Sequence, residues 1–224
     1  MISALKTSTW PTGARKSLPA DPYFQTLWSR LRTVEGATGK LRTMGLTSSR
    51  RGEGVSIVTA NLAVTAAEHG SRVLLVDANA AHPAVHRLFN IPAIPGWSEL
   101  LENGGELTDF IQPSGVVNLT LLTAGQNPGA LARIPESAWN NLFDDVRHDF
   151  DWLLIDLPAL DQVGTTLSTA GLLDGMILVI EAERVRWEVA NRAKESLVQS
   201  QATLLGAVLN KRRQYLPGWI YRAS

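Results

Sequence analysis

Short apolar runs alternate with amphipathic segments along most of the chain. The runs lie at residues 43–47, 73–78, 118–124, 152–158, 175–180 and 203–210. Apolar runs of this length are typical of parallel strands that are buried on both faces of a sheet. Helical spacing predicts helices over residues 56–69 and 187–199, and another that carries Trp139, Leu142, Phe143 and Val146. This order predicts an α/β fold, a parallel β-sheet with right-handed crossovers and helices on both faces.

The two ends of the chain differ from this pattern. Residues 1–20 mix Ser, Thr, Pro, Gly and Lys without periodicity, which predicts a flexible N-terminal leader. Residues 21–213 form the predicted domain and begin with a short helix from Pro22. Residues 214–224 form an aromatic tail with Tyr215, Trp219 and Tyr221. The tail is either a small docking patch or a surface loop with one buried tryptophan.

Composition limits the class of partner. A chain of 224 residues with 45% apolar residues can bury one substantial core. Its formal net charge of zero gives no overall field that attracts nucleic acid. The chain has no cysteine, which excludes thiolate metal sites. No apolar run approaches the roughly 20 residues that span a bilayer. We expect a soluble, cytoplasmic protein.

Two histidines have helical spacing but lack further metal ligands. His82 and His86 are separated by four residues, and no third candidate lies nearby. A solvated helical face is therefore favoured over a metal site at this position.

A glycine-rich loop separates the first predicted strand of the domain from the first long helix. Its sequence is Ser49-Arg-Arg-Gly52-Glu-Gly54, followed by Val55, Ser56 and Ile57. Such a loop points backbone N–H groups inward at a helix N-terminus and can bind a phosphate with main chain alone. Ser56 occupies the place of the hydroxyl that binds Mg²⁺ in a P-loop, and Val55 occupies the place of the phosphate-binding lysine. The alternative is a turn that only caps the helix.

Two aspartates follow predicted strands at the edge of the sheet where ligands bind. Asp77 ends the strand VLLVD, and Asp156 ends WLLID. A carboxylate at a strand end often caps a turn or a helix. Together with Ser56, however, the pair suits Mg²⁺, which prefers oxygen ligands and keeps several waters. We favour the metal site.

Several motifs in a fixed order resemble a known family. They are GEGVSIVTANLA, VLLVDANAAHPAVHRLF, GWSELLENG, LLTAGQNPGAL, FDWLLIDLPAL, LDGMILVIEAERVRWEVANRAKESL and LLGAVLNK. Residues 21–213 resemble the cytoplasmic domain of the bacterial tyrosine kinases (BY-kinases) of capsule and exopolysaccharide synthesis. These are P-loop proteins related to the MinD and ParA ATPases. The resemblance implies a MinD/ParA-like P-loop NTPase fold that binds ATP or ADP with Mg²⁺.

The resemblance also implies roles for single residues. Gly52, Glu53, Gly54, Val55, Ser56 and Ile57 correspond to the nucleotide-binding loop, and Asn210 corresponds to a residue near the adenine. Ser56, Asp77 and Asp156 correspond to the metal-binding set, and the two aspartates to catalytic acids. The family motif D-x-D reads Asp77-Ala78-Asn79 here, so the second acid is missing. After Asp156, the usual Thr-Pro-Pro has become Leu157-Pro158-Ala159.

This sequence also differs from the family pattern at the positions used for oligomerisation and at the tyrosines that are phosphorylated. The family's oligomerising motif E-x-x-R-x-x-R aligns with Pro22, Gln25 and Trp28, so a homo-oligomer would lack its charge pairing. Family members end in a tyrosine cluster, of which Tyr215 and Tyr221 remain as possible phosphoacceptors. The resemblance implies a partner, a membrane-bound polysaccharide chain-length regulator, through which the chain would associate with the membrane.

The missing lysine should affect nucleotide binding and catalysis to different extents. One hydrogen bond to a charged group contributes about 1.5–3 kcal/mol, so the loop would bind nucleotide more weakly. Cationic side chains that contact the transferred phosphoryl group can raise the rate of transfer roughly 10³- to 10⁵-fold, and a valine side chain cannot contribute to this increase. Arg50 and Arg51 are more readily explained as solvated loop residues than as replacements for it. We therefore expect a pseudokinase that acts as an adaptor or regulator. The alternatives are an active autokinase and a MinD-like ATPase switch.

Overall fold

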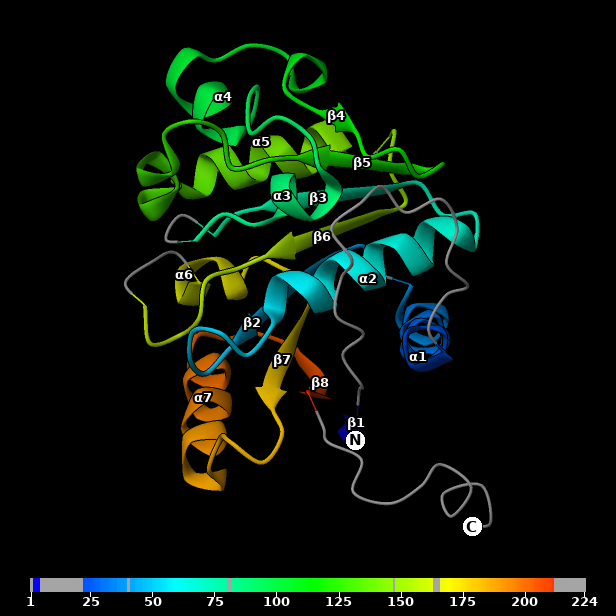
Figure 1. The fold of residues 1–224 in the computed structure, drawn as a ribbon, viewed down its shortest axis with the longest axis vertical. Coiled ribbons are helices and arrows are strands. Elements are labelled where there is room, and N and C mark those ends of the chain that lie inside the picture. The colour runs from blue at the N-terminus through cyan, green and yellow to red at the C-terminus, as the bar shows by residue number, and fades with distance from the viewer. Residues whose placement is uncertain are drawn as a thin grey trace.

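The chain folds around one mixed sheet in the computed structural model, which describes residues 2–4, 22–39, 41–79, 82–146, 148–162 and 166–211. The strands are β1 (Ile2–Ala4), β2 (Thr43–Ser48), β3 (Val73–Asp77), β4 (Gln112–Pro113), β5 (Leu119–Leu122), β6 (Trp152–Asp156), β7 (Gly175–Glu181) and β8 (Leu204–Asn210). Their order is β1-β8-β7-β2-β6-β3-β5-β4, and among the described strand pairs only β4–β5 is antiparallel. The predicted parallel α/β sheet is thus confirmed (Figure 1).

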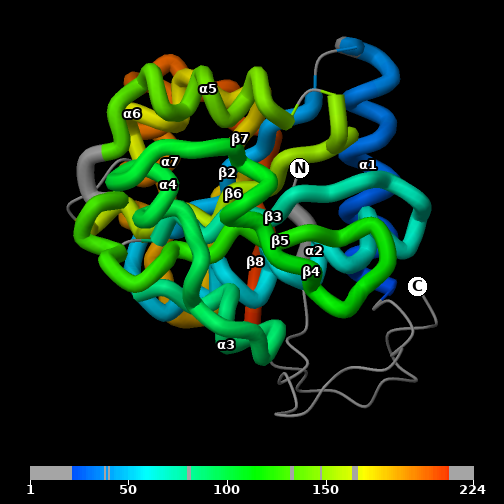
Figure 2. Tube along the Cα trace, turned by 90° about the horizontal axis from the view of Figure 1, so that it is seen from above, coloured from blue at the N-terminus to red at the C-terminus, as the bar shows by residue number. Residues whose placement is uncertain are grey.

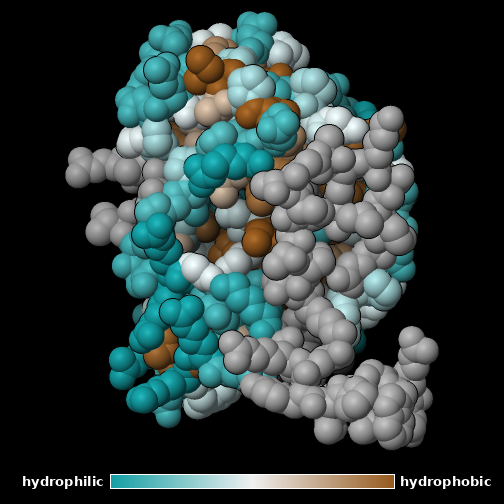
Figure 3. All heavy atoms as spheres, viewed as in Figure 1, coloured by the Kyte–Doolittle hydropathy of each residue, from teal (hydrophilic) through white to brown (hydrophobic). Residues whose placement is uncertain are grey.

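Helices cover both faces of the sheet, as predicted (Figure 2). The helices are α1 (Pro22–Thr38), α2 (Val55–Glu68), α3 (Val85–Phe89), α4 (Trp97–Asn103), α5 (Glu136–Val146), α6 (Thr166–Ala170) and α7 (Trp187–Gln199), with 3₁₀ turns at Leu107–Asp109 and Pro128–Arg133. One apolar cluster joins α1, α2 and α3 to the sheet, and a second joins α4, α5, α6 and α7 to its other face. Hydrophilic residues predominate on the surface around α7 (Figure 3).

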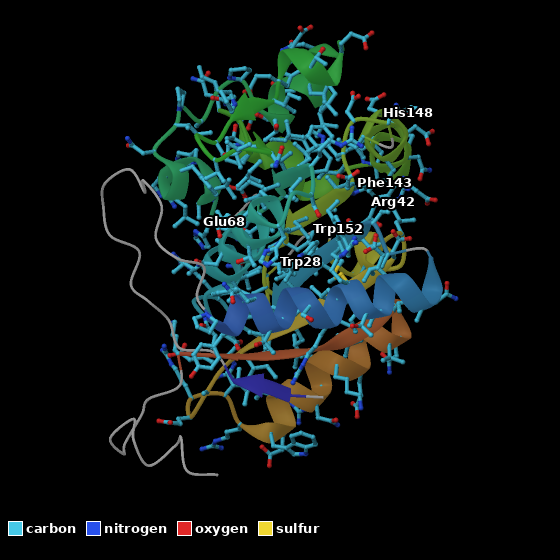
Figure 4. All side chains as sticks on the ribbon, turned by 90° about the vertical axis from the view of Figure 1, so that its right-hand side faces the viewer. Trp28, Arg42, Glu68, Phe143, His148 and Trp152 are labelled. Carbon is cyan, nitrogen blue, oxygen red and sulfur yellow. The ribbon has the colours of Figure 1, made fainter. Side chains whose placement is uncertain are left out.

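Buried residues at helical spacing explain the first helix. Phe24, Leu27, Trp28 and Leu31 are all less than 9% exposed and recur three and four residues apart. The indole of Trp28 packs edge-on against Trp152, with ring centroids 4.9 Å apart (Figure 4). The helix continues beyond these residues to Thr38 and is longer than the predicted short helix. Of the three positions aligned with the oligomerisation motif, Pro22 and Gln25 are exposed, and Trp28 is buried in the core.

Two local predictions were wrong. Residues 2–4 were assigned to a flexible leader, but they form β1 and pair with β8. His82 and His86 do not share a helical face, because α3 begins only at Val85 and both histidines are half-buried. The Nδ1 atom of His86 is buried and has no hydrogen-bond partner among the described residues, and burial lowers the pKa of this imidazole. Residues 5–21 and the aromatic tail lie outside the described residues.

Strand register brings the predicted site residues to one edge of the sheet. β2 lies at the centre, between β7 and β6, and β3 follows β6. Asp77 and Asp156 are directly paired across β3 and β6. The loop after β2 therefore ends beside both acids, at the edge where parallel sheets bind their ligands. In the part of the chain that the structure describes, no helix is long and apolar enough to cross a membrane.

Candidate nucleotide-binding site

The glycine-rich loop turns tightly into α2 at Gly54. This residue precedes the first helical residue and has φ 95°, a left-handed conformation that favours glycine. A Cβ atom on Gly54 would lie 2.2 Å from Nδ2 of Asn210. Glycine is therefore required here both by the backbone conformation and by the close approach of β8.

The carboxylate of Glu53 braces the loop from inside the protein. Glu53 is 2% exposed, and its Oε1 accepts hydrogen bonds from Ser49 Oγ at 2.5 Å and from the Arg50 amide at 2.6 Å. Its Oε2 accepts one from the Glu181 amide, at 2.9 Å. Bonds to a charged acceptor are stronger than neutral ones. One side chain thus connects the start of the loop to the end of β7.

Two residues at the end of β8 hold the other side of the loop. Asn210 is 1% exposed, and its Nδ2 donates to the Glu53 carbonyl at 2.8 Å. The ammonium of Lys211 donates to the Gly52 carbonyl at 2.5 Å and forms an ion pair with Glu181 at 3.2 Å. The loop is therefore held in shape by protein contacts.

The inner side of the loop offers free donors. Among the described residues, no group accepts a hydrogen bond from the amides of Gly52, Gly54, Val55, Ser56 or Ile57. Unsatisfied amides at a helix N-terminus, together with the helix dipole, are the donors that bind a phosphate. No described protein atom therefore takes the place of an anion at these amides.

Valine replaces the cation that this kind of loop usually carries. Val55 is 8% exposed and belongs to the apolar cluster on the α2 face of the sheet. Arg50 and Arg51 are exposed, and neither guanidinium has a partner among the residues described. Among the described residues, the cationic group that contacts the loop is the Lys211 ammonium, and it is bound to the Gly52 carbonyl rather than placed beside the free amides.

Asp77 organises the segment that follows β3. It is fully buried and accepts hydrogen bonds from the amides of Asn79 at 3.2 Å and of Ala84 and Val85, both at 2.9 Å. Burial raises the pKa of Asp77 to about 6, although these amides and the charge of Arg87 oppose the shift. The cap that sequence reasoning weighed as an alternative is therefore present. It engages both oxygens of the carboxylate.

Asp156 is the carboxylate that lacks partners. It is fully buried, and neither of its oxygens accepts a hydrogen bond from a residue that the structure describes. Burial and the neighbouring charge of Asp77 raise its pKa well above the usual value. The nearby Ser56 hydroxyl opposes this shift, although it does not reach hydrogen-bonding geometry. A buried, unpartnered carboxylate beside a second acid and a hydroxyl fits a hard divalent cation. Ser56 and Asp156 would hold Mg²⁺ directly, with Asp77 beside them.

The structure brings together all the predicted site residues that it describes. The loop from Gly52 to Ile57, the two acids and Asn210 lie at one edge of the sheet. Tyr215 and Tyr221 lie outside the described residues. No group of three or more His, Cys, Asp or Glu side chains suited to a metal ion occurs in the described part of the chain, so a cation here would need the Ser56 hydroxyl and water.

Sequence reasoning missed the residues that brace the loop. Lys211 and Glu181 were not singled out, although each lies where a strand ends at the ligand-binding edge. Glu53 was expected only as part of the nucleotide loop, whereas its side chain points into the protein. The position of Lys211 directly after Asn210 was the available signal.

These features define a class of protein. A glycine-rich loop between a central parallel strand and a helix, with acids at the ends of the neighbouring strands, is the architecture of a P-loop NTPase. The MinD protein of Pyrococcus horikoshii, solved with Mg-ADP, shares this fold with a TM-score of 0.66 and 22% identity, over 81% of this chain and 76% of that chain.

More similar proteins specify the family. The family model for the cellulose biosynthesis protein BcsQ matches residues 41–205. The putative tyrosine-protein kinase CapB of Staphylococcus aureus is 33% identical over 178 residues, which cover 78% of this chain and 77% of CapB. The crystal structure of the chimerical protein CapA2B2 superposes with a TM-score of 0.79 and 28% identity, over 89% of this chain and 87% of that chain. The chain belongs to the BY-kinase family of P-loop NTPases.

Proposed function

We propose that this protein is a catalytically impaired BY-kinase, a pseudokinase that acts as an adaptor or regulator in exopolysaccharide or capsule biosynthesis and export. The observation that carries the proposal is the buried Val55 at the position of the P-loop lysine, in a loop whose shape is otherwise intact. The loop offers main-chain donors for a phosphate but no charge for a transferring phosphoryl group.

Weak binding of ATP or ADP with Mg²⁺ is compatible with this site. The free amides of the loop supply hydrogen bonds to phosphate oxygens, and Ser56 and Asp156 supply oxygen ligands for the metal ion. A bound Mg²⁺ would neutralise part of the phosphate charge. The loop is braced by Glu53, Asn210 and Lys211, so it requires no reorganisation to accept an anion.

Phosphoryl transfer lacks two groups that the family uses. In the described part of the chain, no cation is available to a phosphate at the loop, because the nearby ammonium of Lys211 is bound to the Gly52 carbonyl and to Glu181. Asn79 replaces the second acid of the D-x-D motif and accepts a hydrogen bond from the His82 amide through its side-chain oxygen. An amide cannot accept a proton from a tyrosine hydroxyl at neutral pH. Both losses reduce the rate of transfer more than they reduce binding.

The proposed partner is a membrane-bound polysaccharide chain-length regulator, which would bring this cytoplasmic chain to the membrane. The support is family membership, since CapB is named a putative tyrosine-protein kinase and the family resembled is that of capsule and exopolysaccharide synthesis. An adaptor needs a stably folded surface to which its partner can bind. The sheet and the two apolar clusters that pack on it stabilise such a fold.

A second candidate is a MinD-like ATPase switch. The specific observation in its favour is the intact pair of Asp77 and Asp156 beside Ser56, which suits water activation at a metal ion. Such a switch would hydrolyse ATP and dimerise only with ATP, whereas an adaptor would do neither.

One experiment separates these functions. The full chain is incubated with γ-labelled ATP and Mg²⁺, and released phosphate and phosphotyrosine are measured beside an Asp77→Ala variant. We expect neither product above the level of that variant. Phosphotyrosine that disappears in Asp77→Ala would establish an active kinase. Phosphate release without phosphotyrosine, together with ATP-dependent dimers in light scattering, would establish the switch.

A further inference from the structure

A cavity lies at the edge of the sheet opposite to the phosphate loop, where the parallel strands begin. Its volume is about 270 Å³, and it lies between the end of α5, the starts of β2 and β6, and the turn before β7. Figure 4 faces this edge and shows Arg42 and Phe143 near each other, with Trp152 beside them. No residue that lines the cavity belongs to the loop or to the acid pair. A ligand in this cavity would therefore occupy a second, separate site.

The interior of the cavity is apolar. Phe143 and Val146 come from the last turns of α5, Phe150 from the turn that follows, and Leu172 from the segment before β7. Phe143 and Val146 are 8% and 5% exposed, so the cavity enters the second apolar cluster. Sites for drug-sized ligands usually occupy roughly 300–1,000 Å³, so this cavity suits a smaller molecule with one large apolar group.

Three charged side chains line the cavity, and one of them is already neutralised. They are those of Arg42, Asp151 and Asp174. Arg72 donates to Oδ1 of Asp151 at 2.9 Å and to its Oδ2 at 3.4 Å. The hydrogen bonds and the charge of Arg72 lower the pKa of Asp151. Asp151 therefore already has an ionic partner and does not require one from a ligand.

The other two charges, on Arg42 and Asp174, have no ionic partner in the described part of the chain. Oδ2 of Asp174 accepts hydrogen bonds from neutral donors, namely the amides of Arg42 and Thr43 at 2.9 Å and 2.8 Å and the Thr43 hydroxyl at 2.9 Å. Neutral donors do not remove the negative charge. Oδ1 of Asp174 and the guanidinium of Arg42 have no described partner. One negative and one positive group are thus both available to a ligand.

The two available charges lie close together. Because Oδ2 of Asp174 is 2.9 Å from the amide nitrogen of Arg42, the carboxylate lies within the length of one arginine side chain from the guanidinium. A ligand with one charge would pair with one of these groups and leave the other unpaired. A guanidinium can bind a carboxylate through two parallel hydrogen bonds, and an ammonium can donate to a carboxylate. The rim is therefore complementary to a zwitterion.

We propose that this cavity binds a free α-amino acid with a large apolar side chain, of the class of leucine and phenylalanine. The side chain enters the apolar interior, the carboxylate pairs with Arg42, and the ammonium pairs with Oδ1 of Asp174. An α-amino acid carries both charged groups on one carbon atom, which matches two rim charges that lie close together. The site lies away from the loop, so binding does not depend on nucleotide or on the proposed function.

Matched ligands test the proposal on the full chain without nucleotide. L-Phenylalanine carries all three groups, whereas N-acetyl-L-phenylalanine lacks the ammonium, L-phenylalaninamide lacks the carboxylate and L-alanine lacks the large side chain. Binding is followed by ¹H–¹⁵N NMR titration at about pH 6, where the ammonium groups are charged. We expect saturable shifts at the amides of Thr43, Leu153 and Asp174, with a dissociation constant on the order of 1 mM for L-phenylalanine. Each of the other ligands should bind about tenfold more weakly.

Protein variants separate the contacts. Arg42→Gln should remove the preference for L-phenylalanine over its amide, and Asp174→Asn should remove the preference over the N-acetyl form. Asparagine keeps an oxygen that accepts from the same two backbone amides. Arg192→Gln, at an exposed position of α7, should leave both preferences unchanged. Leu172→Trp, which fills the cavity, should weaken binding of L-phenylalanine, with folding of each variant checked by circular dichroism.

Three outcomes would overturn the proposal. The first is the absence of saturable shifts at these amides with L-phenylalanine up to about 20 mM. The second is equal affinity for L-phenylalanine, its amide and its N-acetyl form, which would show that the rim charges take no part. The third is binding of L-alanine as tight as that of L-phenylalanine, which would show that the apolar interior is not used.

Discussion

Restoring the P-loop lysine is the most direct perturbation of the site. In a Val55→Lys variant, the ammonium would add one charge-assisted hydrogen bond to bound phosphate, which contributes about 1.5–3 kcal/mol. This corresponds to roughly 10- to 150-fold tighter binding of ATP. The substitution also removes a side chain that is only 8% exposed. The lysine stem can remain buried along the loop, so we expect a loss of only about 1 kcal/mol in the free energy of unfolding.

Titration calorimetry with ATP and Mg²⁺ measures the affinity, and chemical denaturation measures stability. Gln199→Lys is the matched control, because it adds the same charge at the exposed end of α7, away from the loop. We expect a gain in affinity for Val55→Lys alone. A folded Val55→Lys protein whose affinity equals that of the parent chain would refute the conclusion that the free amides form a phosphate site.

Three further predictions concern the core, the brace and the acid pair. Trp28→Ala should lower the free energy of unfolding by about 3–5 kcal/mol in urea titrations, whereas the exposed Arg30→Ala should change it by less than about 0.5 kcal/mol. Glu53→Ala leaves hydrogen-bond donors of the loop without an acceptor and should lower the free energy of unfolding by about 2–3 kcal/mol in the same titrations. An unchanged urea midpoint would show that the hydrogen bonds of Glu53 do not contribute to stability. Burial raises the pKa of Asp77 to about 6, so the stability that depends on protonation of Asp77 is lost as pH rises from about 4 through 6, and the raised pKa of Asp156 adds a loss in the same direction. Nucleotide-free protein should therefore lose about 1–3 kcal/mol between pH 5 and pH 7.5, Mg²⁺ should restore part of it, and Asp156→Asn should flatten the profile in thermal melts.

The sequence predicted the elements that are buried on both faces or amphipathic over several turns. The strand ending at Asp156 and the helix Trp187–Gln199 were located to within two residues, because apolar runs and helical spacing report burial directly. Short elements were missed. Helices α3 and α6 have five residues each, too few for a periodic pattern, and tertiary contacts determine them.

The candidate site was predicted in position but not in its supporting contacts. A glycine loop and strand-end acids are local signals, and parallel topology brings them together. The brace is not local: the side chain of Asn210 bonds to Glu53, 157 residues earlier, and Lys211 bonds to Gly52 across 159 residues. No spacing rule connects such positions. The burial of Trp28 could not be predicted from its alignment with a charged motif either, because the contact that buries it comes from Trp152.

The two departures from the family pattern that affect function most have the same structural consequence. Val55 stands where the family carries the phosphate-binding lysine, and Trp28 stands where it carries an arginine for oligomerisation. Both are now buried, at 8% and 4% exposure, in the same apolar cluster. Full burial of a large apolar side chain contributes about 1.5–3 kcal/mol. At each position, an apolar side chain that packs in the core stands in place of a charged side chain that would bind a phosphate or a neighbouring subunit. The loop keeps its shape through Glu53, Asn210 and Lys211, none of which needs a nucleotide. Burial at these two positions beside a loop that remains formed is the structural support for the proposed adaptor function.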